Sequence, residues 1–325
     1  MRSWRKSPLW YWLSVLIPGT AVVVFPSGHP WLFLLTLIAV ILAGDRVLGE
    51  DVKCHSGVIS AAVPIAFICL WLMAVFSALM RAKLAMPAEV VGLVTASGIL
   101  SAFAMAHIHE VMHRGHRLSR GMSDIALTIA GYPHYRLVHE LHHSNVGDPR
   151  YGSTAHAGLS VWRHVGRSFG GAAIEALAFD RERGRQGCTR RLLTPAMAWI
   201  GVVTLVSVIC GHRGVLFYLG QSGVSVFVVE AIGYMQHYGL DNAVPRREQQ
   251  IAWDVSFWLS NRLFVNNGRH THHHLEQTQP YSRLARIGDA LPGGYLEMFL
   301  LALIPPLWFA LMDRKLEVNV HSSRK

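Results

Sequence analysis

The chain has 325 residues, of which 51% are hydrophobic and 15% charged, and its formal net charge is +10. An ordinary soluble domain carries roughly a quarter of charged residues, whereas residues 7–44 and 54–80 contain no Asp, Glu, Lys or Arg at all. These proportions exclude a simple soluble globule and a disordered chain, and they favour an integral membrane protein. The four cysteines show no CxxC spacing, so they indicate neither a disulfide framework nor a thiolate zinc site.

The apolar runs predict six membrane-spanning helices in a single domain covering residues 1–325. Turn signals at residues 26–30 and 211–214 divide two long runs into helical hairpins. The last apolar run, near residues 296–312, is short and contains Pro305 and Pro306, so we expect an interfacial helix there, with a seventh span as the alternative. The six spans are expected near residues 8–25, 30–44, 55–80, 89–108, 192–210 and 215–233.

Basic residues gather at the N-terminus and near residues 114–120, 181–191 and 246–247. An even number of spans places all four clusters on one side, which the positive-inside rule assigns to the cytoplasm of a bacterial inner membrane. The basic N-terminus has the look of a signal peptide, but no small-residue cleavage site follows, so we expect it to be retained. The charge suits an anionic lipid surface, and without interleaved aromatic residues it does not predict a nucleic-acid partner.

Nineteen histidines are more than membrane insertion or a basic surface requires. An HxxxH pair extends the fourth predicted span, and its spacing puts both imidazoles on one helix face, where they can share a metal. Two HxxHH triplets and a single histidine at the end of the sixth span complete four clusters beyond the span ends. The candidate metal ligands are His109, His113, His139, His142, His143, His237, His270, His273 and His274.

Nine imidazoles are too many for one zinc ion, which uses three or four ligands, so the count indicates a dinuclear site. The first pair also matches the HExxH pattern of zinc proteases, with Glu110 as the general base, but that interpretation leaves both triplets unexplained. Imidazole binds iron, copper, zinc and nickel, so the residue type does not select the metal, and copper remains a competitor to iron.

Together, these clusters resemble the histidine boxes of the membrane fatty acid desaturase and hydroxylase superfamily, and within it the alkane monooxygenase branch. Residues 109–114 are similar to an HELxHK-like first box, residues 233–239 to NYxEHYG, and residues 269–274 to RHSxHH, followed by Tyr281 and Leu284. Shorter similarities occur at residues 45–51, 147–149, 291–295 and 305–308, so the resemblance runs from about residue 45 to 314.

The resemblance implies an all-α integral membrane protein with six transmembrane helices and a cytoplasmic histidine-rich di-metal cap. It also implies that the nine histidines hold two non-haem iron ions, which activate O2 to hydroxylate an unactivated C–H bond of an alkane or alkyl chain taken from the bilayer. Electrons would come from a separate rubredoxin or ferredoxin-type donor, because the chain has no flavin or Rossmann motif. Basic residues of the cytoplasmic face would steer an acidic donor, among them Arg181, Arg183, Arg185, Arg190 and Arg191.

Two departures from the alkane monooxygenase pattern blur this assignment. The second box has HxxHH spacing, as in desaturases, in place of EHxxGHH. Gln236 stands where that branch usually has Glu before the single histidine. A desaturase, acetylenase or oxidative decarboxylase is therefore the alternative on the same scaffold. A metal transporter or sensor is a third hypothesis, disfavoured because transporters place polar ligands at mid-membrane.

Several neighbouring residues have open roles. His134 and His272 are candidate hydrogen-bond donors around the metal ligands. The carboxylates of Glu110, Glu140 and Asp148 either accept an imidazole N–H or form salt bridges with nearby arginines. Candidates for the wall of a substrate channel are Trp71, Phe76, Phe103 and Met105, although lipid contact or packing is the favoured role for each.

Overall fold

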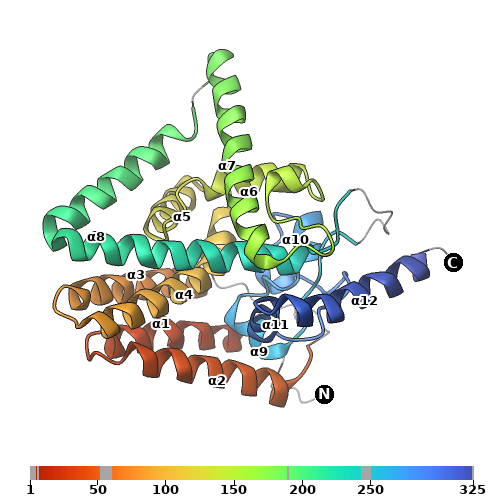
Figure 1. Ribbon diagram of the computed structural model, residues 1–325, viewed down its shortest axis with the longest axis horizontal. Coiled ribbons are helices and arrows are strands. Elements are labelled where there is room, and N and C mark those ends of the chain that lie inside the picture. Colours follow the sequence, from red (N-terminus) through yellow and green to blue (C-terminus); the bar gives the residue numbers. More distant parts are fainter. Residues whose placement is uncertain (1–4, 6, 52–60, 189, 243–249, 324–325) are drawn as a thin grey trace.

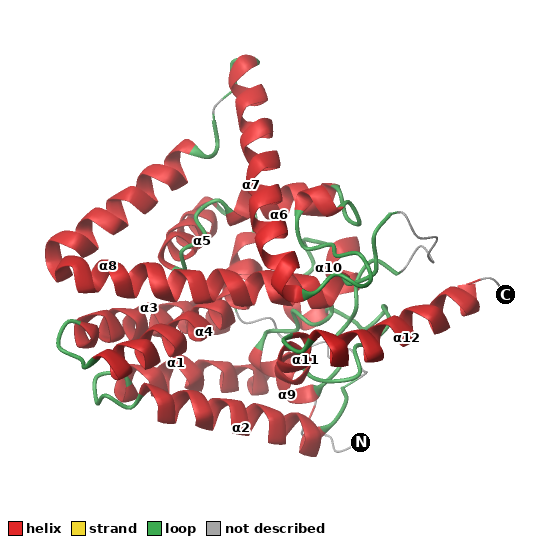
Figure 2. Cartoon of the chain, in the orientation of Figure 1, coloured by secondary structure: helices red, strands yellow, loops and turns green. Residues whose placement is uncertain are grey.

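The computed structural model describes the chain except residues 1–4, 6, 52–60, 189, 243–249 and 324–325. The described part consists of helices joined by loops and turns, and it has no strand (Figure 2). Residues 55–60 of the third expected span and the basic residues at 246–247 lie outside the described residues. The α-helices are α1 (Leu13–Val24), α2 (Pro30–Leu48), α3 (Ala62–Ala82), α4 (Pro87–Met112), α5 (Arg117–Ile129), α6 (Tyr135–Ser144), α7 (Val161–Arg185), α8 (Leu193–His237), α9 (Trp258–Leu263), α10 (His270–Leu275), α11 (Tyr295–Ala302) and α12 (Pro305–Ser323), with short 3-10 helices at Pro8–Trp12, Pro149–Tyr151 and Tyr281–Arg283.

Among the described residues, four helices, α2, α3, α4 and α8, are long and apolar enough to cross a membrane, and the bent pair of α11 and α12 would make a fifth. The first expected span is a shorter apolar helix, Pro8–Val24. Pro30 and Pro87 each occupy a first helical position, where the missing N–H costs nothing and the fixed φ favours helix. The all-helical membrane class is thus confirmed at the level of four to five candidate spans, and the count of six stays a prediction.

The expected hairpin at residues 211–214 appears as a sharp break inside α8. Gly211 has φ 63° and ψ −162°, so the helix axis turns there and continues to His237. The expected interfacial helix near residues 296–312 is in fact two helices, α11 and α12, whose axes differ by 117°. Pro305 and Pro306 explain this break, since neither can donate a backbone hydrogen bond to the preceding turn.

In Figure 1 the helices α1 to α4 lie side by side with the second limb of α8, and α5, α6 and α7 cover one side of this bundle. Polar side chains join the helices inside it: Trp71 Nε1 donates to Ser101 Oγ (3.0 Å), and Ser101 donates to Gln221 Oε1 (2.8 Å). Such interhelical bonds stabilise helix packing where lipid provides no hydrophobic drive. The ends of α4 and α8 meet α6 and α10 at one end of the bundle, where the histidine boxes lie.

Candidate metal centre

Four helices supply the nine histidines that the sequence singled out. The 26 residues of α4 reach roughly 39 Å at 1.5 Å per residue, which exceeds the ~30 Å hydrocarbon core of a bilayer. His109 lies in its last turn, and His113 directly follows the helix. The HxxHH triplets lie on α6 and α10, where positions i, i+3 and i+4 share a face. His237 ends α8. The structure brings all nine side chains into one cluster.

Five of these histidines form a first group, in which every pair of ligand atoms lies within 4.8 Å: His109, His113, His139, His143 and His273. Their Nε2 atoms converge. His139 Nε2 lies 2.9 Å from His109 Nε2, 3.1 Å from His113 Nε2 and 2.8 Å from His143 Nε2. Nitrogen ligands at about 2.1 Å from one ion, at right angles, are about 3 Å apart. The spacing therefore matches atoms arranged around a shared metal.

A second group lies directly beside the first. His142, His237 and His274 have ligand atoms within 4.8 Å of one another, and His270 Nε2 joins them at 3.1 Å from His274 Nε2. The imidazoles of His143 and His274 touch across the two groups, with ring centroids 4.4 Å apart. The geometry thus divides nine histidines into five and four around adjacent centres. Their identity as iron ligands stays a prediction.

Burial favours the neutral form of the clustered histidines, and the neutral imidazole is the form that binds a metal ion. Burial lowers the pKa of His142 to about 4, so the ring is neutral at physiological pH and offers a lone pair. Neither ring nitrogen of His142 has a hydrogen-bond partner among the described residues. A buried polar atom without a partner costs free energy, and a bound cation would supply the missing interaction. The donor set therefore fits a pair of metal ions.

The three neighbouring carboxylates form salt bridges with arginines. Glu110 pairs with Arg114 at 3.1 Å and accepts the backbone N–H of Tyr281, and Asp148 pairs with Arg150 at 2.7 Å. The partner of Glu140 is Arg191, at 2.6 Å, which the sequence did not indicate.

The two extra histidines that flank the boxes also have other contacts. His272 Nδ1 accepts the backbone N–H of Ala285 (2.8 Å). The ring of His134 packs against Tyr132 and Phe169. Neither belongs to the two ligand groups formed by the described residues.

A buried carboxylate and a buried arginine anchor the last histidine box. Asp254 accepts the backbone N–H of Thr271 (2.9 Å) through one oxygen and that of Gly288 (3.1 Å) through the other. Burial raises the pKa of Asp254, and these backbone donors oppose that rise. Arg269, which precedes the box, donates to the backbone carbonyl of Asp51. These contacts fix α10 against the loops on either side of it.

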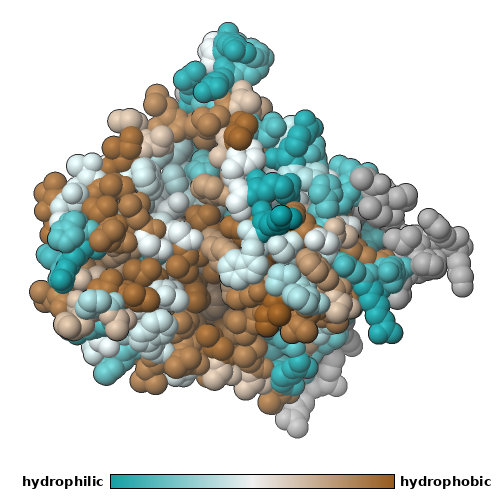
Figure 3. All heavy atoms as spheres, viewed as in Figure 1, coloured by the Kyte–Doolittle hydropathy of each residue, from teal (hydrophilic) through white to brown (hydrophobic). Residues whose placement is uncertain are grey.

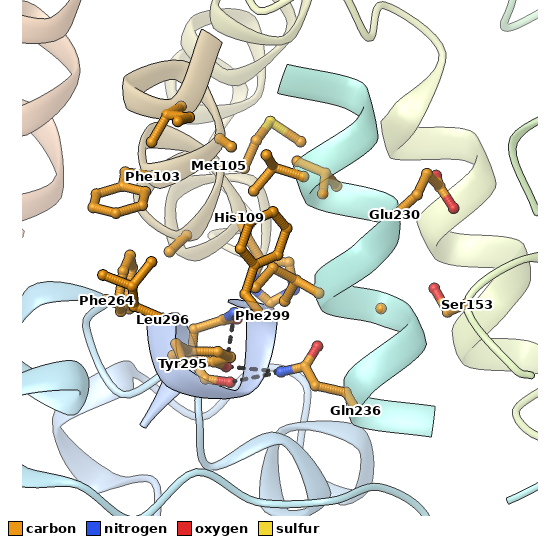
Figure 4. Close-up of a pocket in the computed structure, with 18 of the residues that line it drawn as sticks. Phe103, Met105, His109, Ser153, Glu230, Gln236, Phe264, Tyr295, Leu296 and Phe299 are labelled. Atoms are coloured by element: carbon orange, nitrogen blue, oxygen red, sulfur yellow. Dashed lines mark hydrogen bonds between the residues drawn. The ribbon is translucent and has the colours of Figure 1, made fainter. Parts of the chain in front are cut away.

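An apolar cavity of about 200 Å³ lies between the helices of the bundle and extends to the histidine cluster. His109, His139, His142 and His270, which come from both groups, line one end. In Figure 4 the labelled side chains of Phe103, Phe264, Leu296 and Phe299 surround it. The rest of its apolar wall comes mainly from α2, α4, α8 and α11, including Leu34, Leu37, Ile38, Met105, Val228, Ile232 and Leu300.

Of the four channel-wall candidates, Phe103 and Met105 line this cavity. Trp71 is buried and bonded to Ser101, whereas Phe76 is exposed on the outer surface. Sequence reasoning missed the contributions of α2 and α11. The family resemblance at residues 291–295 was the available signal for α11, because this segment ends in Tyr295, which lines the cavity.

The fold and the site define a class: a helical membrane protein with a cluster of histidines that could hold metal ions, beside an apolar cavity. Residues 84–302 match the family model described as Fatty acid desaturase, and the chain belongs to that family.

Curated relatives agree with this family. The chain is 29% identical to alkane 1-monooxygenase 1 of Pseudomonas aeruginosa, over 67% of this chain and 61% of that protein. Identity to alkane 1-monooxygenase 2 of the same organism is 26%, over 95% and 88% of the two chains. It is 27% for the hydroxylase component of a xylene/toluene monooxygenase of Pseudomonas putida, over 72% and 66%.

Proposed function

We propose that the protein is a membrane non-haem di-iron monooxygenase that hydroxylates an unactivated C–H bond of an alkane or alkyl chain, using O2 and electrons from another protein. The observation that carries the proposal is that two adjacent groups of histidines, five and four in number, lie beside an apolar cavity. Relatives named alkane 1-monooxygenase support the reaction class. The named monooxygenases include one for xylene and toluene, so hydrocarbon oxidation is their common theme.

The two groups would hold one iron each, five histidines on the first and four on the second. Five imidazoles exceed the four ligands of a tetrahedral zinc site, which favours a metal that accepts higher coordination. When bound, the iron pair supplies O2 activation, the chemistry that cleaving an alkyl C–H bond requires. The protein supplies the position of the chain, a dry cavity and neutral imidazoles.

The cavity supports a hydrocarbon substrate that arrives from the bilayer. A dry cavity of about 150 Å³ holds one benzene molecule, so about 200 Å³ suits a somewhat larger ring or a medium-length alkyl segment. Leu300 lines the cavity and also an outer groove between α2, α11 and α12. Figure 3 shows apolar side chains around a hollow in this face of the molecule. A lipid-soluble substrate would pass between α2 and α11.

Electrons would come from a rubredoxin or ferredoxin-type donor on the cytoplasmic side of a bacterial inner membrane. Arg181 and Arg185 are exposed in the last turns of α7, and Arg190 is exposed after its end, so an acidic protein would be attracted there. Arg191 links this corner to the histidine helix α6 through its ion pair with Glu140. The proposed docking face would therefore be connected through α6 to the histidines of the candidate metal centre.

Metal analysis and product analysis test the proposal together. Purified protein is expected to contain two iron ions per chain, and 18O2 with n-octane to give an alcohol carrying one labelled oxygen. His237→Ala should lose iron and turnover, whereas His272→Gln, which keeps an acceptor for the Ala285 N–H, should retain both. One zinc ion per chain, or unchanged turnover in His237→Ala, would overturn the site. An alkene without labelled oxygen would instead identify a desaturase.

A further inference from the structure

A polar group on the wall of the apolar cavity is not used in the reaction proposed above. Gln236 Nε2 donates to Tyr295 Oη at 2.8 Å, and Asn267 Nδ2 lies 3.4 Å from the same oxygen. All three residues line the cavity together with His109 and His270. Figure 4 shows Gln236 reaching from α8 to Tyr295 on α11. The group therefore stands at the same cavity as the candidate metal ligands.

The hydrogen-bonding capacity of this group is only partly used. A hydroxyl has two acceptor lone pairs and one donor proton. Both amide donors occupy the lone pairs of Tyr295, and its O–H proton has no acceptor among the described residues. The Gln236 amide is oriented by the Asn267 carbonyl, which accepts from the same Nε2 at 3.4 Å. Gln236 Oε1 likewise has no donor in the described part of the chain. One free donor and one free acceptor thus stand together.

The backbone of Tyr295 is positioned by residues 45–51 and 291–295. These two segments resemble the family but contain no histidine. The Tyr295 backbone N–H donates to Ser260 Oγ at 3.3 Å. Ser260 in turn donates to Asp45 through its N–H (2.9 Å) and its hydroxyl (2.6 Å). Gly294 is required at this point, because a Cβ there would overlap the Asp45 carboxylate. The end of α2 therefore fixes the start of α11 and the backbone of Tyr295, while Gln236 and Asn267 contact the phenol oxygen.

We propose that the Tyr295 hydroxyl and the Gln236 carbonyl form a subsite that binds the hydroxyl group of an alkyl alcohol. A hydrocarbon offers these groups no partner, whereas an alcohol accepts the tyrosine proton and donates to the amide oxygen. The nearby Glu230 does not compete, since its carboxylate accepts from Tyr132 (2.5 Å) and from Ser168.

Gln at position 236 is essential to this subsite. A carboxyl group there would offer an acceptor oxygen to Tyr295 in either protonation state and would withdraw the phenol proton from the cavity. The amide donates instead and leaves the proton available. The proposal names a ligand class for the cavity of the proposed function, yet alcohol binding requires no turnover and is measured without an electron donor.

Equilibrium binding tests the subsite with two ligands of equal heavy-atom count, 1-octanol and n-nonane. The metal-loaded protein is titrated in nanodiscs, and protein-free nanodiscs are subtracted. Tyr295→Phe should weaken 1-octanol binding about tenfold, the effect of one buried hydrogen bond, and leave n-nonane binding unchanged. The control Tyr218→Phe removes a buried hydroxyl bonded to the Thr128 carbonyl, away from the cavity, and should change neither.

Gln236→Glu provides a second variant that retains the phenol. It should lose the preference for 1-octanol to a similar extent, because the carboxyl group takes the tyrosine proton. If both variants bind 1-octanol as the unmodified protein does, the subsite holds water or nothing and the proposal is wrong. Alcohol binding that depends on Tyr295 in a protein without hydroxylase activity would uphold the subsite and overturn only the proposed function.

Discussion

Close packing between α4 and α8 at Gly98 leads to a quantitative prediction for Gly98→Ala. A Cβ on Gly98 would lie 2.5 Å from Val224 Cβ and 2.8 Å from the Gln221 carbonyl oxygen, roughly 1 Å inside ordinary van der Waals contact. The carbonyl belongs to a helix backbone and cannot rotate away, so the two helices must separate. Overpacking of this kind costs about 1–3 kcal/mol. Because α4 and α8 carry His109 and His237, the separation should also disturb the metal centre.

Gly223→Ala is the matched control, because a Cβ at Gly223 meets nothing within 4 Å. Both substitutions gain the same helix propensity, about 1 kcal/mol in water, so their difference isolates the packing cost. Thermal unfolding in one detergent should place Gly98→Ala about 1–3 kcal/mol below Gly223→Ala, with lower iron content. Equal stability of the two variants would show that α4 and α8 do not pack this closely.

Three further predictions concern charged and titratable groups elsewhere in the molecule. Asp51→Ala breaks a buried ion pair with Arg262 (2.9 Å) and should cost about 3–5 kcal/mol in chemical unfolding; a loss below about 1 kcal/mol would contradict it. Burial lowers the pKa of His164 to about 3. Between pH 6.5 and 3, His164 is therefore protonated in the unfolded chain but neutral in the folded chain. Stability should therefore fall as pH drops from 6.5 toward 3, and His164→Gln should make this fall shallower by up to about 1.4 kcal/mol per pH unit, measured by unfolding at several pH values. Replacing Arg181 and Arg185 by Glu should slow reduction by an acidic donor several-fold at low salt, with the difference shrinking at about 1 M salt in stopped-flow measurements.

The helical class and the grouping of the histidines were predictable because each rests on a local rule. A charge-free run of about 20 residues has few alternatives to a membrane helix. The i, i+3 and i, i+4 spacings of His139, His142 and His143 place their rings on one face wherever the helix lies. The packing of α4, α6, α8 and α10 then brings their histidines together in one cluster.

The cavity and the division of the last apolar run were not predictable in the same way. A wall made by Leu34, Phe103 and Phe299 depends on how α2, α4 and α11 pack, and each residue alone is indistinguishable from a lipid-facing one. The break between α11 and α12 had a sequence signal in Pro305, but the 117° bend depends on packing. The partner of Glu140 was also missed, because Arg191 lies 51 residues away in the chain.

The segment at residues 45–51 contains no histidine, yet it organises the metal end of the molecule. Asp45 bonds to Ser260, and Asp51 contacts both Arg262 and Arg269, which lie more than 200 residues further along the chain. Buried charges are retained only where they are paired, because removing either partner strands the other in a low-dielectric interior. The C-terminal end of α2 and the residues that follow it are thus connected to α9 and to the turn before α10 by bonds that a shift of either element would break. The last histidine box is therefore positioned by α2 as well as by its own helix, which gives the similarity at residues 45–51 a physical reason.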